Sequence, residues 1–178
     1  MSRIGTQPIP IPSKVKVSLH DRILTTTGPQ GDLQLEIPNS LTILIKSSQL
    51  ILHKNRVHQI VKATHGLYRT LINNMIIGVN QGFSKHLILR GVGYRAQMNN
   101  KDLVLNVGYS HIVTIVPPTN IKITTLNNLE IVVSGPDKTL VGELSAQIRG
   151  VKPPEPYKGK GIRYKQELIN HKIGKTGK

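Results

Sequence analysis

The chain carries one pattern of alternating apolar and polar positions twice. The order Asp-Leu-x-Leu-x-aliphatic occurs in Asp32-Leu33-Gln34-Leu35-Glu36-Ile37 and again in Asp102-Leu103-Val104-Leu105-Asn106-Val107, each time after a turn-forming stretch. Farther along, Ile43-x-Ile45 and Leu50-x-Leu52 around Ser47-Ser48 match Ile121-x-Ile123 and Leu129-x-Ile131 around Asn127-Asn128. Apolar residues at every second position predict short antiparallel strands with one buried face. The repeat therefore predicts two related groups of strands.

A helical period follows each group of strands. In the first copy the i, i+3, i+4, i+7 spacing is met by Val57, Ile60, Val61, Thr64, Leu67, Leu71, Ile72, Met75, Ile76 and Val79. Tyr68 falls on the same face, Asn55 is the expected N-cap, and Gly78 lies near the expected end. In the second copy Leu140, Val141, Leu144 and Ile148 follow Gly135-Pro136-Asp137, with Asp137 as the expected cap.

Each copy thus consists of strands followed by a helix that covers the apolar face of a sheet. The predicted fold class is α+β, with two tandem, duplicated domains, each a small, mostly antiparallel sheet covered by one helix. A boundary near Gln81-Gly82 gives an N-terminal domain over residues 1–82, with a Pro-rich arm, and a C-terminal domain over residues 83–178. Strand alternation weakens after Arg149, so the remainder is expected to be a segment of another kind, a basic loop and tail.

Charge indicates the class of partner. The 24 Lys+Arg residues outnumber the 9 Asp+Glu residues and give a net charge of +15, which points to a polyanion, with nucleic acid as the first candidate. No apolar run approaches the roughly 18 residues that a membrane span needs, so no membrane partner is expected. Residues 149–178 hold nine Lys+Arg against two Glu, which concentrates the positive charge there. The chain has no Cys, which excludes disulfides, thiolate zinc sites and cysteine nucleophiles.

The segment Pro153-Pro154-Glu155-Pro156-Tyr157-Lys158-Gly159-Lys160-Gly161-Ile162-Arg163-Tyr164 combines residue types suited to binding RNA. Prolines favour extended backbone, and glycines allow the backbone to approach a partner closely. Lysines neutralise phosphates, Arg163 is suited to bridging two of them, and the two tyrosines are suited to stacking on bases or sugars. The expected RNA-binding residues are Arg149, Lys152, Tyr157, Lys158, Gly159, Lys160, Gly161, Arg163, Tyr164, Lys165, Lys172 and Lys175, with Lys85, Arg90 and Arg95 as weaker candidates. A solvated linker is the alternative interpretation of the loop.

Other candidate sites are weaker. Gly91-Val92-Gly93 lacks the third glycine of a dinucleotide-binding loop, because Ala96 stands there, so a turn or bulge in a sheet is expected and no cofactor. His53, His58 and His65 have no accompanying carboxylate cluster, so exposed helix histidines are expected and no metal. A small hydrolase using Ser110 and His111 is the enzymatic alternative, but adjacent residues do not make a nucleophile–base pair. No enzyme activity and no small-molecule substrate are expected.

Several motifs in order resemble one family. Pro-Glu-Pro-Tyr-Lys-Gly-Lys-Gly-Ile-Arg-Tyr is similar to the signature of the bacterial-type large-subunit ribosomal protein L-six family. The similarity extends over the chain and includes Met1-Ser2-Arg3-Ile4-Gly5 with Pro8 and Pro12, Asn74-Met75-Ile76-Ile77-Gly78-Val79-x-x-Gly82-Phe83, Leu89-x-Gly91-Val92-Gly93-Tyr94-Arg95-Ala96, Gly108-Tyr109-Ser110-His111, and Asp137-Lys138 followed by Ile148-Arg149. The chain departs from the family at Lys152, where Arg is frequent, and at Asn170-His171, where basic residues are common.

The resemblance implies a structural protein of the large ribosomal subunit, with two domains from an ancient duplication. It implies large-subunit ribosomal RNA and neighbouring ribosomal proteins as partners, near the sarcin–ricin region and stalk base where translation factors dock. The first residues lack a targeting pattern, and Ile and Asn are abundant, which favours a plastid-encoded protein over a bacterial one. A free-standing nucleic-acid-binding protein is the main alternative.

Overall fold

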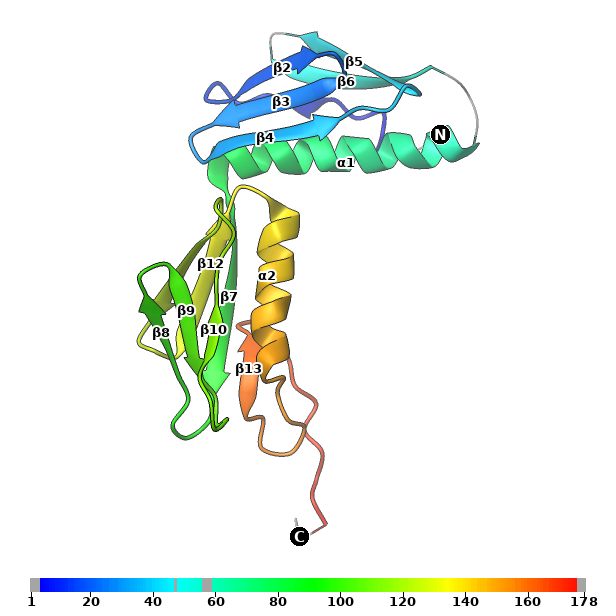
Figure 1. Cartoon of the computed structure of the whole chain (residues 1–178). Coiled ribbons are helices and arrows are strands. Elements are labelled where there is room, and N and C mark those ends of the chain that lie inside the picture. The colour runs from blue at the N-terminus through cyan, green and yellow to red at the C-terminus, as the bar shows by residue number, and fades with distance from the viewer. Residues whose placement is uncertain (1–3, 47, 56–58, 176–178) are drawn as a thin grey trace. The chain divides into compact units, whose positions relative to one another are not determined.

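The computed structural model describes residues 4–46, 48–55 and 59–175. The chain divides into two compact units (Figure 1). Unit 1 comprises Met1–Phe83 with Pro136–Lys138, and unit 2 comprises Ser84–Gly135 with Thr139–Lys178.

Unit 1 consists of two three-stranded antiparallel sheets, ordered β2-β3-β4 and β1-β6-β5, and one long helix. Its elements are β1 (Ile9–Pro10), β2 (Lys16–His20), β3 (Ile23–Gly28), β4 (Gly31–Glu36), β5 (Leu41–Lys46), β6 (Gln49–Lys54) and α1 (Gln59–Gln81). Helix α1 contacts β3, β4 and β6. The core between them includes Ile9, Leu24, Leu50 and Ile72, which come from both sheets and the helix, so one core joins the layers.

The buried stripe of α1 differs from the expected one. It runs through Val61, His65, Ile72, Met75, Ile76 and Val79. Leu67, expected on this face, is 54% exposed, whereas His65, expected to be exposed, is 4% exposed. The Nε2 of His65 lies 3.0 Å from the carbonyl oxygen of Leu52, to which it donates a hydrogen bond, and this bond makes burial of the polar ring possible.

The residues before α1 were expected to include its N-cap, Asn55, and two exposed helix histidines, His53 and His58. The side chain of Asn55, the expected N-cap, accepts a hydrogen bond from the hydroxyl of Thr42 on β5 and donates one to the Asn39 carbonyl. The N–H groups that it would cap belong to residues outside the described part of the chain, so the N-cap stays a prediction. Residues 56–58, which include Val57 and His58, lie outside the described residues. His53 is exposed but stands on strand β6, so expecting it on a helix was wrong.

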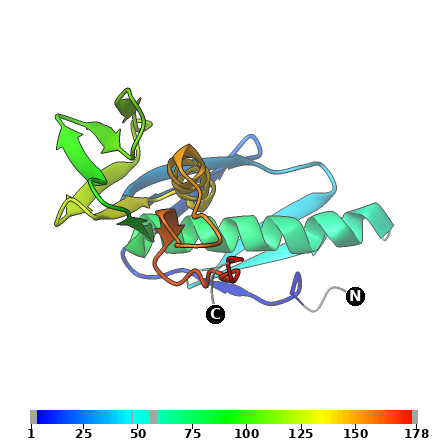
Figure 2. The same ribbon diagram turned by 90° about the horizontal axis from the view of Figure 1, so that it is seen from below.

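Unit 2 repeats the scheme with a four-stranded sheet, ordered β11-β12-β7-β13, a three-stranded sheet, ordered β10-β9-β8, and one helix. Its elements are β7 (Phe83–Arg90), β8 (Arg95–Asn99), β9 (Asp102–Asn106), β10 (Val113–Ile115), β11 (Lys122–Leu126), β12 (Glu130–Gly135), α2 (Lys138–Val151) and β13 (Gly161–Tyr164). Figures 1 and 2 show α2 lying along the four-stranded sheet, beside β13. Its buried side chains include Val141, Leu144 and Ile148, as the helical spacing predicted.

The predicted duplication is visible in the hairpins. Strands β3–β4 and β8–β9 form one pair of equivalent hairpins, and β5–β6 and β11–β12 form the other. Each set is followed by a helix, so the predicted class of two duplicated α+β domains is confirmed. Asn127 and Asn128 have φ of +52° and +53°, values that Asn tolerates better than most residues, which explains the tight turn predicted there.

The segment after Arg149 is not only loop and tail, as its weak alternation suggested. Gly161–Tyr164 forms β13, which pairs antiparallel with β7 and sets Ile162 opposite Leu89. Ile162 is completely buried. The strand was missed because four residues with buried positions at Gly161 and Ile162 give no clear period of two.

Candidate nucleic-acid interface

Three loops of unit 2 meet at one end of its sheets, here called the loop end and defined as residues 90–95, 107–111 and 151–160. Arg90 pairs with Gly161 across β7 and β13, which brings the first and third loops together. The Tyr109 hydroxyl donates a hydrogen bond of 2.9 Å to the Val151 carbonyl and joins the second and third. The Tyr94 ring packs over Gly91 and Gly108, where an added Cβ would lie 2.8 and 3.3 Å from ring atoms.

The loop end is strongly basic on its surface. Arg90, Arg95, Lys158 and Lys160 are exposed, and Lys152 is half-buried. Residues 90–95 and 107–111 contain no acidic residue, and 151–160 contains only Glu155. The Glu155 carboxylate accepts the backbone N–H of Lys158, so it serves the loop as a cap. Predicted candidates from distant parts of the sequence therefore share one surface that suits a polyanion.

The loop at 153–160 is a hydrogen-bonded turn rather than a simple extended segment. The Glu155 N–H donates to the Lys160 carbonyl at 2.9 Å, and the Gly159 N–H donates to the Glu155 carbonyl at 3.1 Å. At its base, the Ile162 N–H donates to the Lys152 carbonyl at 2.7 Å. These bonds hold the backbone around Lys158 and Lys160 in one shape, while both side chains remain exposed. A freely solvated linker would lack such bonds, which argues against the linker interpretation.

Gly159 and Gly161 are buried, so the close approach that they permit is to the chain itself. A Cβ on Gly161 would lie 2.7 Å from the Pro153 carbonyl oxygen and 2.8 Å from that of Lys152. The φ of Gly161 is +143° and that of Gly159 is +67°, both in a region that favours glycine. Their backbone was expected to face an RNA partner, but the structure gives both residues a role in folding the loop.

Arg149 is engaged inside unit 2. Its guanidinium donates to both carboxylate oxygens of Glu167, at 2.9 and 2.6 Å. Glu167 also accepts the Tyr164 N–H at 3.0 Å. The hydrogen bonds from Arg149 lower the pKa of Glu167 below its ordinary value, against the opposing effect of partial burial, and the same bonds raise the pKa of Arg149. The pair fastens the chain after β13 to α2, and it reduces the donors that Arg149 has left for RNA.

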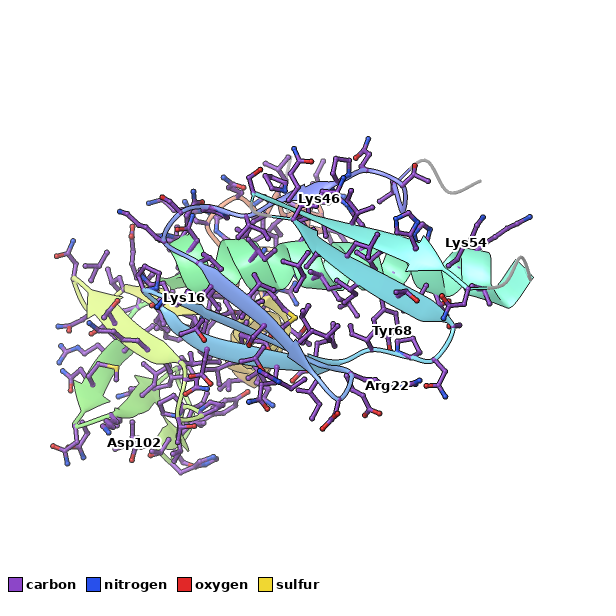
Figure 3. All side chains as sticks on the ribbon, turned by 90° about the horizontal axis from the view of Figure 1, so that it is seen from above. Lys16, Arg22, Lys46, Lys54, Tyr68 and Asp102 are labelled. Atoms are coloured by element: carbon purple, nitrogen blue, oxygen red, sulfur yellow. The ribbon has the colours of Figure 1, made fainter. Side chains whose placement is uncertain are left out.

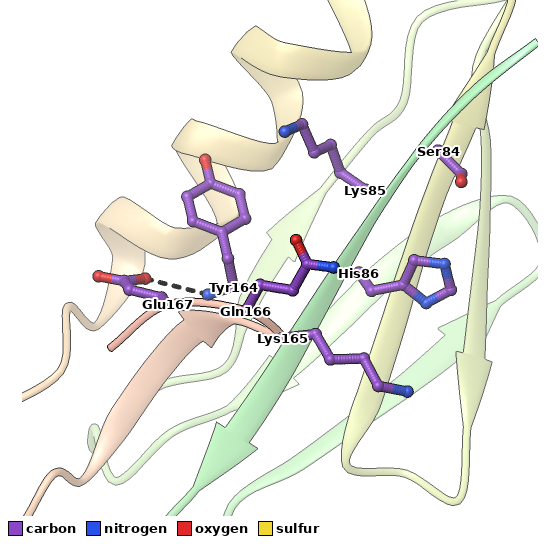
Figure 4. Close-up of a pocket in the computed structure, with 7 residues that line it drawn as sticks. All are labelled: Ser84, Lys85, His86, Tyr164, Lys165, Gln166 and Glu167. Atoms are coloured by element: carbon purple, nitrogen blue, oxygen red, sulfur yellow. Dashed lines mark hydrogen bonds between the residues drawn. The ribbon is translucent and has the colours of Figure 1, made fainter. Parts of the chain in front are cut away.

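A second basic cluster surrounds a hollow of about 400 Å³ beside β7 and β13, lined by Ser84, Lys85, His86, Tyr164, Lys165, Gln166 and Glu167 (Figure 4). Lys85 Nζ lies 5.8 Å from the centroid of the Tyr164 ring, within the range of a cation–π contact. Lys165 is exposed and lies 3.8 Å from Glu130. Lys85 and Tyr164, both singled out from the sequence, thus lie side by side, whereas Lys165 points away from them (Figure 4).

Arg163 and Tyr157 have contrasting surroundings. The Nε of Arg163 is buried and has no hydrogen-bond partner among the described residues. Tyr157 is 58% exposed at the tip of the loop. Its carbonyl oxygen lies 3.3 Å from Nδ1 of His171, and the Lys172 N–H donates to the Pro156 carbonyl at 2.9 Å, so the tail folds back against the loop. Lys172 and Lys175 remain exposed beside it.

Tyr109 and His111 are components of this surface that the site prediction left out. Their rings stack with centroids 5.7 Å apart and planes 11° apart. Lys152 Nζ lies 4.6 Å from the centroid of the Tyr109 ring. The sequence offered a signal, because Gly108-Tyr109-Ser110-His111 was recognised as a motif, but only proximity to Lys152 in space connects it to the basic loop.

Unit 1 also carries exposed cations, but they are spread over its surface. Figure 3 shows the exposed Lys16, Arg22 and Lys46, together with the half-buried Lys54, at separate places around its two sheets, and Tyr68 on α1, where it packs against the core. The part of the chain that the structure describes holds no group of three or more His, Asp or Glu side chains placed to bind a metal ion. Among the described residues, no helix is long and apolar enough to cross a membrane.

Comparison with known proteins identifies the family to which the chain belongs. A family model described as "Ribosomal protein L6" matches residues 11–82 and 90–165. The chain belongs to the ribosomal protein L6 family. The two matched segments correspond to the two repeated α+β parts, as the resemblance implied. The second matched segment includes the turn at 153–160 and strand β13.

Relatives with that name are similar over their whole lengths. The chain is 49% identical to the large ribosomal subunit protein uL6c of Cyanophora paradoxa, over 100% of this chain and 99% of the relative. It is 49% identical to uL6 of Natranaerobius thermophilus over 100% of both chains. It is 48% identical to uL6 of Synechococcus elongatus, over 100% of this chain and 99% of that protein.

Proposed function

We propose that this member of the ribosomal protein L6 family is a structural component of the large ribosomal subunit that binds large-subunit ribosomal RNA through the loop end of unit 2. The observation that carries the proposal is that five cations lie together on the loop end: Arg90, Arg95, Lys152, Lys158 and Lys160. The one acidic residue of the loop end, Glu155, accepts a hydrogen bond from the backbone of the same turn. Phosphate contacts of this kind position a protein on RNA without a chemical reaction.

The fold supports a mechanical role. The 153–160 turn is anchored on one side to the end of α2 and on the other to β13, and both anchors belong to the core of unit 2. Side chains mounted on a preformed backbone lose little further backbone entropy when they bind, because the turn is already ordered. The proposed contribution to translation is to hold the RNA near the sarcin–ricin region and stalk base in one arrangement.

The relatives bear on the compartment. One of them is named uL6c, and two others are the uL6 proteins of Natranaerobius thermophilus and Synechococcus elongatus. Together with the Ile- and Asn-rich composition, this supports a ribosome of plastid origin, with a bacterial ribosome as the alternative. No catalytic step is part of the proposal.

The test reverses the two exposed loop lysines, in a Lys158→Glu, Lys160→Glu double variant. Both side chains are exposed, and the hydrogen bonds of the turn use backbone groups and the Glu155 carboxylate but neither lysine side chain, so the variant is expected to fold normally. It should be depleted from large subunits in a sucrose gradient and should bind isolated RNA weakly. If six to ten phosphates are contacted, wild-type affinity falls by about 10³–10⁵ between 50 and 200 mM salt, and loss of two contacts lowers the slope by about 1.8.

A matched control carries the same change of charge elsewhere. Lys16 and Lys46 are exposed on strands of unit 1, so a Lys16→Glu, Lys46→Glu variant has the same net charge as the loop variant. The control is expected to enter the large subunit better than the loop variant. Equal depletion of both variants would show that total charge, and not the loop end, governs binding. Sedimentation of the wild-type protein apart from ribosomal subunits would instead favour a free-standing nucleic-acid-binding protein.

A further inference from the structure

The Tyr109 ring is held in a fixed position at the loop end. Its hydroxyl donates to the Val151 carbonyl at 2.9 Å, where α2 ends. The ammonium of Lys152 lies 4.6 Å from the ring centroid, and a cation over an aromatic face is attracted to it. Yet Tyr109 is still 41% exposed, so these contacts orient the ring without covering it. An oriented, partly exposed aromatic ring is a surface on which another flat group can stack.

His111 extends this surface outward. Its ring is nearly parallel to that of Tyr109, at 11°, and the residue is exposed. Neither ring fills the core of unit 2, whose fully buried side chains are aliphatic residues such as Leu103, Leu105 and Ile148. The stack therefore contributes aromatic area at the surface, on the same end of the unit as the exposed lysines and arginines.

Phosphate binding alone gives no reason for this arrangement. A phosphate is bound by charge and hydrogen-bond donors, whereas a flat aromatic surface complements the face of a nucleobase. Bases inside an RNA helix are covered by their neighbours, so a base that stacks on protein must be unpaired, as in a loop or bulge. A protein partner with an apolar surface is less consistent with the site, because the exposed Arg90, Arg95, Lys158 and Lys160 lie on loops at the same end of unit 2.

We propose that the Tyr109–His111 stack receives an unpaired nucleobase of the RNA that the loop end binds. His111 contacts the base, Tyr109 supports His111, and Lys152 is a positioning residue that acts through Tyr109. The inference rests on the proposed function and adds to it a contact that does not depend on charge. It also assigns a role to the Gly108-Tyr109-Ser110-His111 motif, for which a hydrolase was the alternative.

The test compares three substitutions at one position, with in vitro transcribed large-subunit ribosomal RNA as the probe. His111→Ala removes the ring and is expected to weaken binding by about 5-fold or more, since stacking contributes about 1–3 kcal/mol per base. The dependence of affinity on salt should stay as in the wild type, because no phosphate contact is lost. His111→Phe keeps a flat ring and should restore affinity, whereas His111→Lys supplies a charge without a ring and should not.

Several outcomes would overturn the inference. Wild-type affinity in the alanine variant, rescue by lysine, or a salt slope lowered by the loss of the ring would each show that His111 does not stack on a base. Urea unfolding of each variant tests for a merely structural effect. Such an effect would lower the unfolding midpoint and weaken RNA binding in both His111→Phe and His111→Ala. Failure of the wild-type protein to bind RNA in a salt-dependent way would overturn the proposed function as well, whereas normal binding with no effect at His111 removes only this inference.

A crosslink identifies the contacting group directly. A photoreactive phenylalanine analogue at position 111, in protein incorporated into large subunits, is expected to label an unpaired nucleotide. Labelling of a base-paired nucleotide or of a neighbouring ribosomal protein would contradict the inference and leave the loop lysines as the RNA contacts.

Discussion

Gly161→Ala is expected to destabilise unit 2 strongly, although it adds a single methyl group. The new Cβ would stand 2.7 Å from the Pro153 carbonyl oxygen, 2.7 Å from Cα of Pro154 and 2.8 Å from the Lys152 carbonyl oxygen. All three atoms belong to backbone, so no side-chain rotation relieves the overlap. A φ of +143° adds about 1–3 kcal/mol of backbone strain for a residue other than glycine. Together these effects should lower the free energy of unfolding by about 2–4 kcal/mol.

The assay is urea unfolding, combined with hydrogen exchange of peptides from each unit. With a slope of about 2 kcal/mol/M, the unfolding midpoint of unit 2 should fall by about 1–2 M. Amides of β7 and β13 should exchange faster, because Ile162 can no longer stay in register with Leu89, while amides of unit 1 serve as an internal reference.

Gly142→Ala provides the matched control. Gly142 lies in α2, and an added Cβ there would meet nothing within 4 Å, so alanine should stabilise the helix by about 0.5–1 kcal/mol. Unfolding of Gly161→Ala at the wild-type urea concentration would contradict the expected overlap, because the backbone around Gly161 would then have moved apart without a loss of stability.

Two further predictions concern polar groups. Glu167→Gln removes the ion pair with Arg149 but keeps an acceptor for the Tyr164 N–H. Because both partners of the ion pair are partly exposed, the free energy of unfolding at pH 7, measured in urea, should fall by no more than about 1 kcal/mol. The pKa of Glu167 is lowered in the folded state, so the stabilisation by the ion pair is complete above the ordinary pKa of 4.5 and is lost as pH falls through the lowered pKa. The unfolding free energies of wild type and variant should therefore converge in acid. A difference between them that does not change with pH would contradict a stabilising role of the ionised Glu167 carboxylate. His65→Ala opens a cavity and leaves the Leu52 carbonyl without its donor, so unit 1 should lose about 2–4 kcal/mol, whereas His53→Ala, at an exposed position, should change the unfolding midpoint little.

The repeat was predictable because local signals agreed with the fold. Alternation in Asp32–Ile37 and Asp102–Val107 gave strands, and Asn127-Asn128 gave a turn that the backbone confirms. His65 was not predictable in the same way. Its polarity suggested exposure, and only the carbonyl of Leu52, which is brought near by the fold, allows burial. Strand β13 was missed for a similar reason, since its partner β7 is far away in the sequence.

The candidate site shows the same division between local and long-range information. Composition and the Pro/Gly/Lys-rich motif pointed to the 153–160 loop, and this segment does present exposed Lys158 and Lys160. The sequence could not tell which cations are engaged internally, and Arg149 is held by Glu167. Nor could it join Tyr109 to Lys152, because contacts between loops depend on tertiary packing and leave no periodic pattern in the sequence.

The pairing of β13 with β7 has a consequence for the order in which the protein is made. Strand β7 opens unit 2, but one of its two neighbours is synthesised only after α2 is complete. Until then the nascent sheet has an open edge with unpaired N–H and C=O groups, which is a site for unwanted association. Unit 1 has no such dependence on late residues for its sheets and can fold earlier during synthesis. The same late event that closes the sheet also completes the basic turn, so a nascent chain acquires the surface proposed to bind RNA only once its own folding is nearly finished.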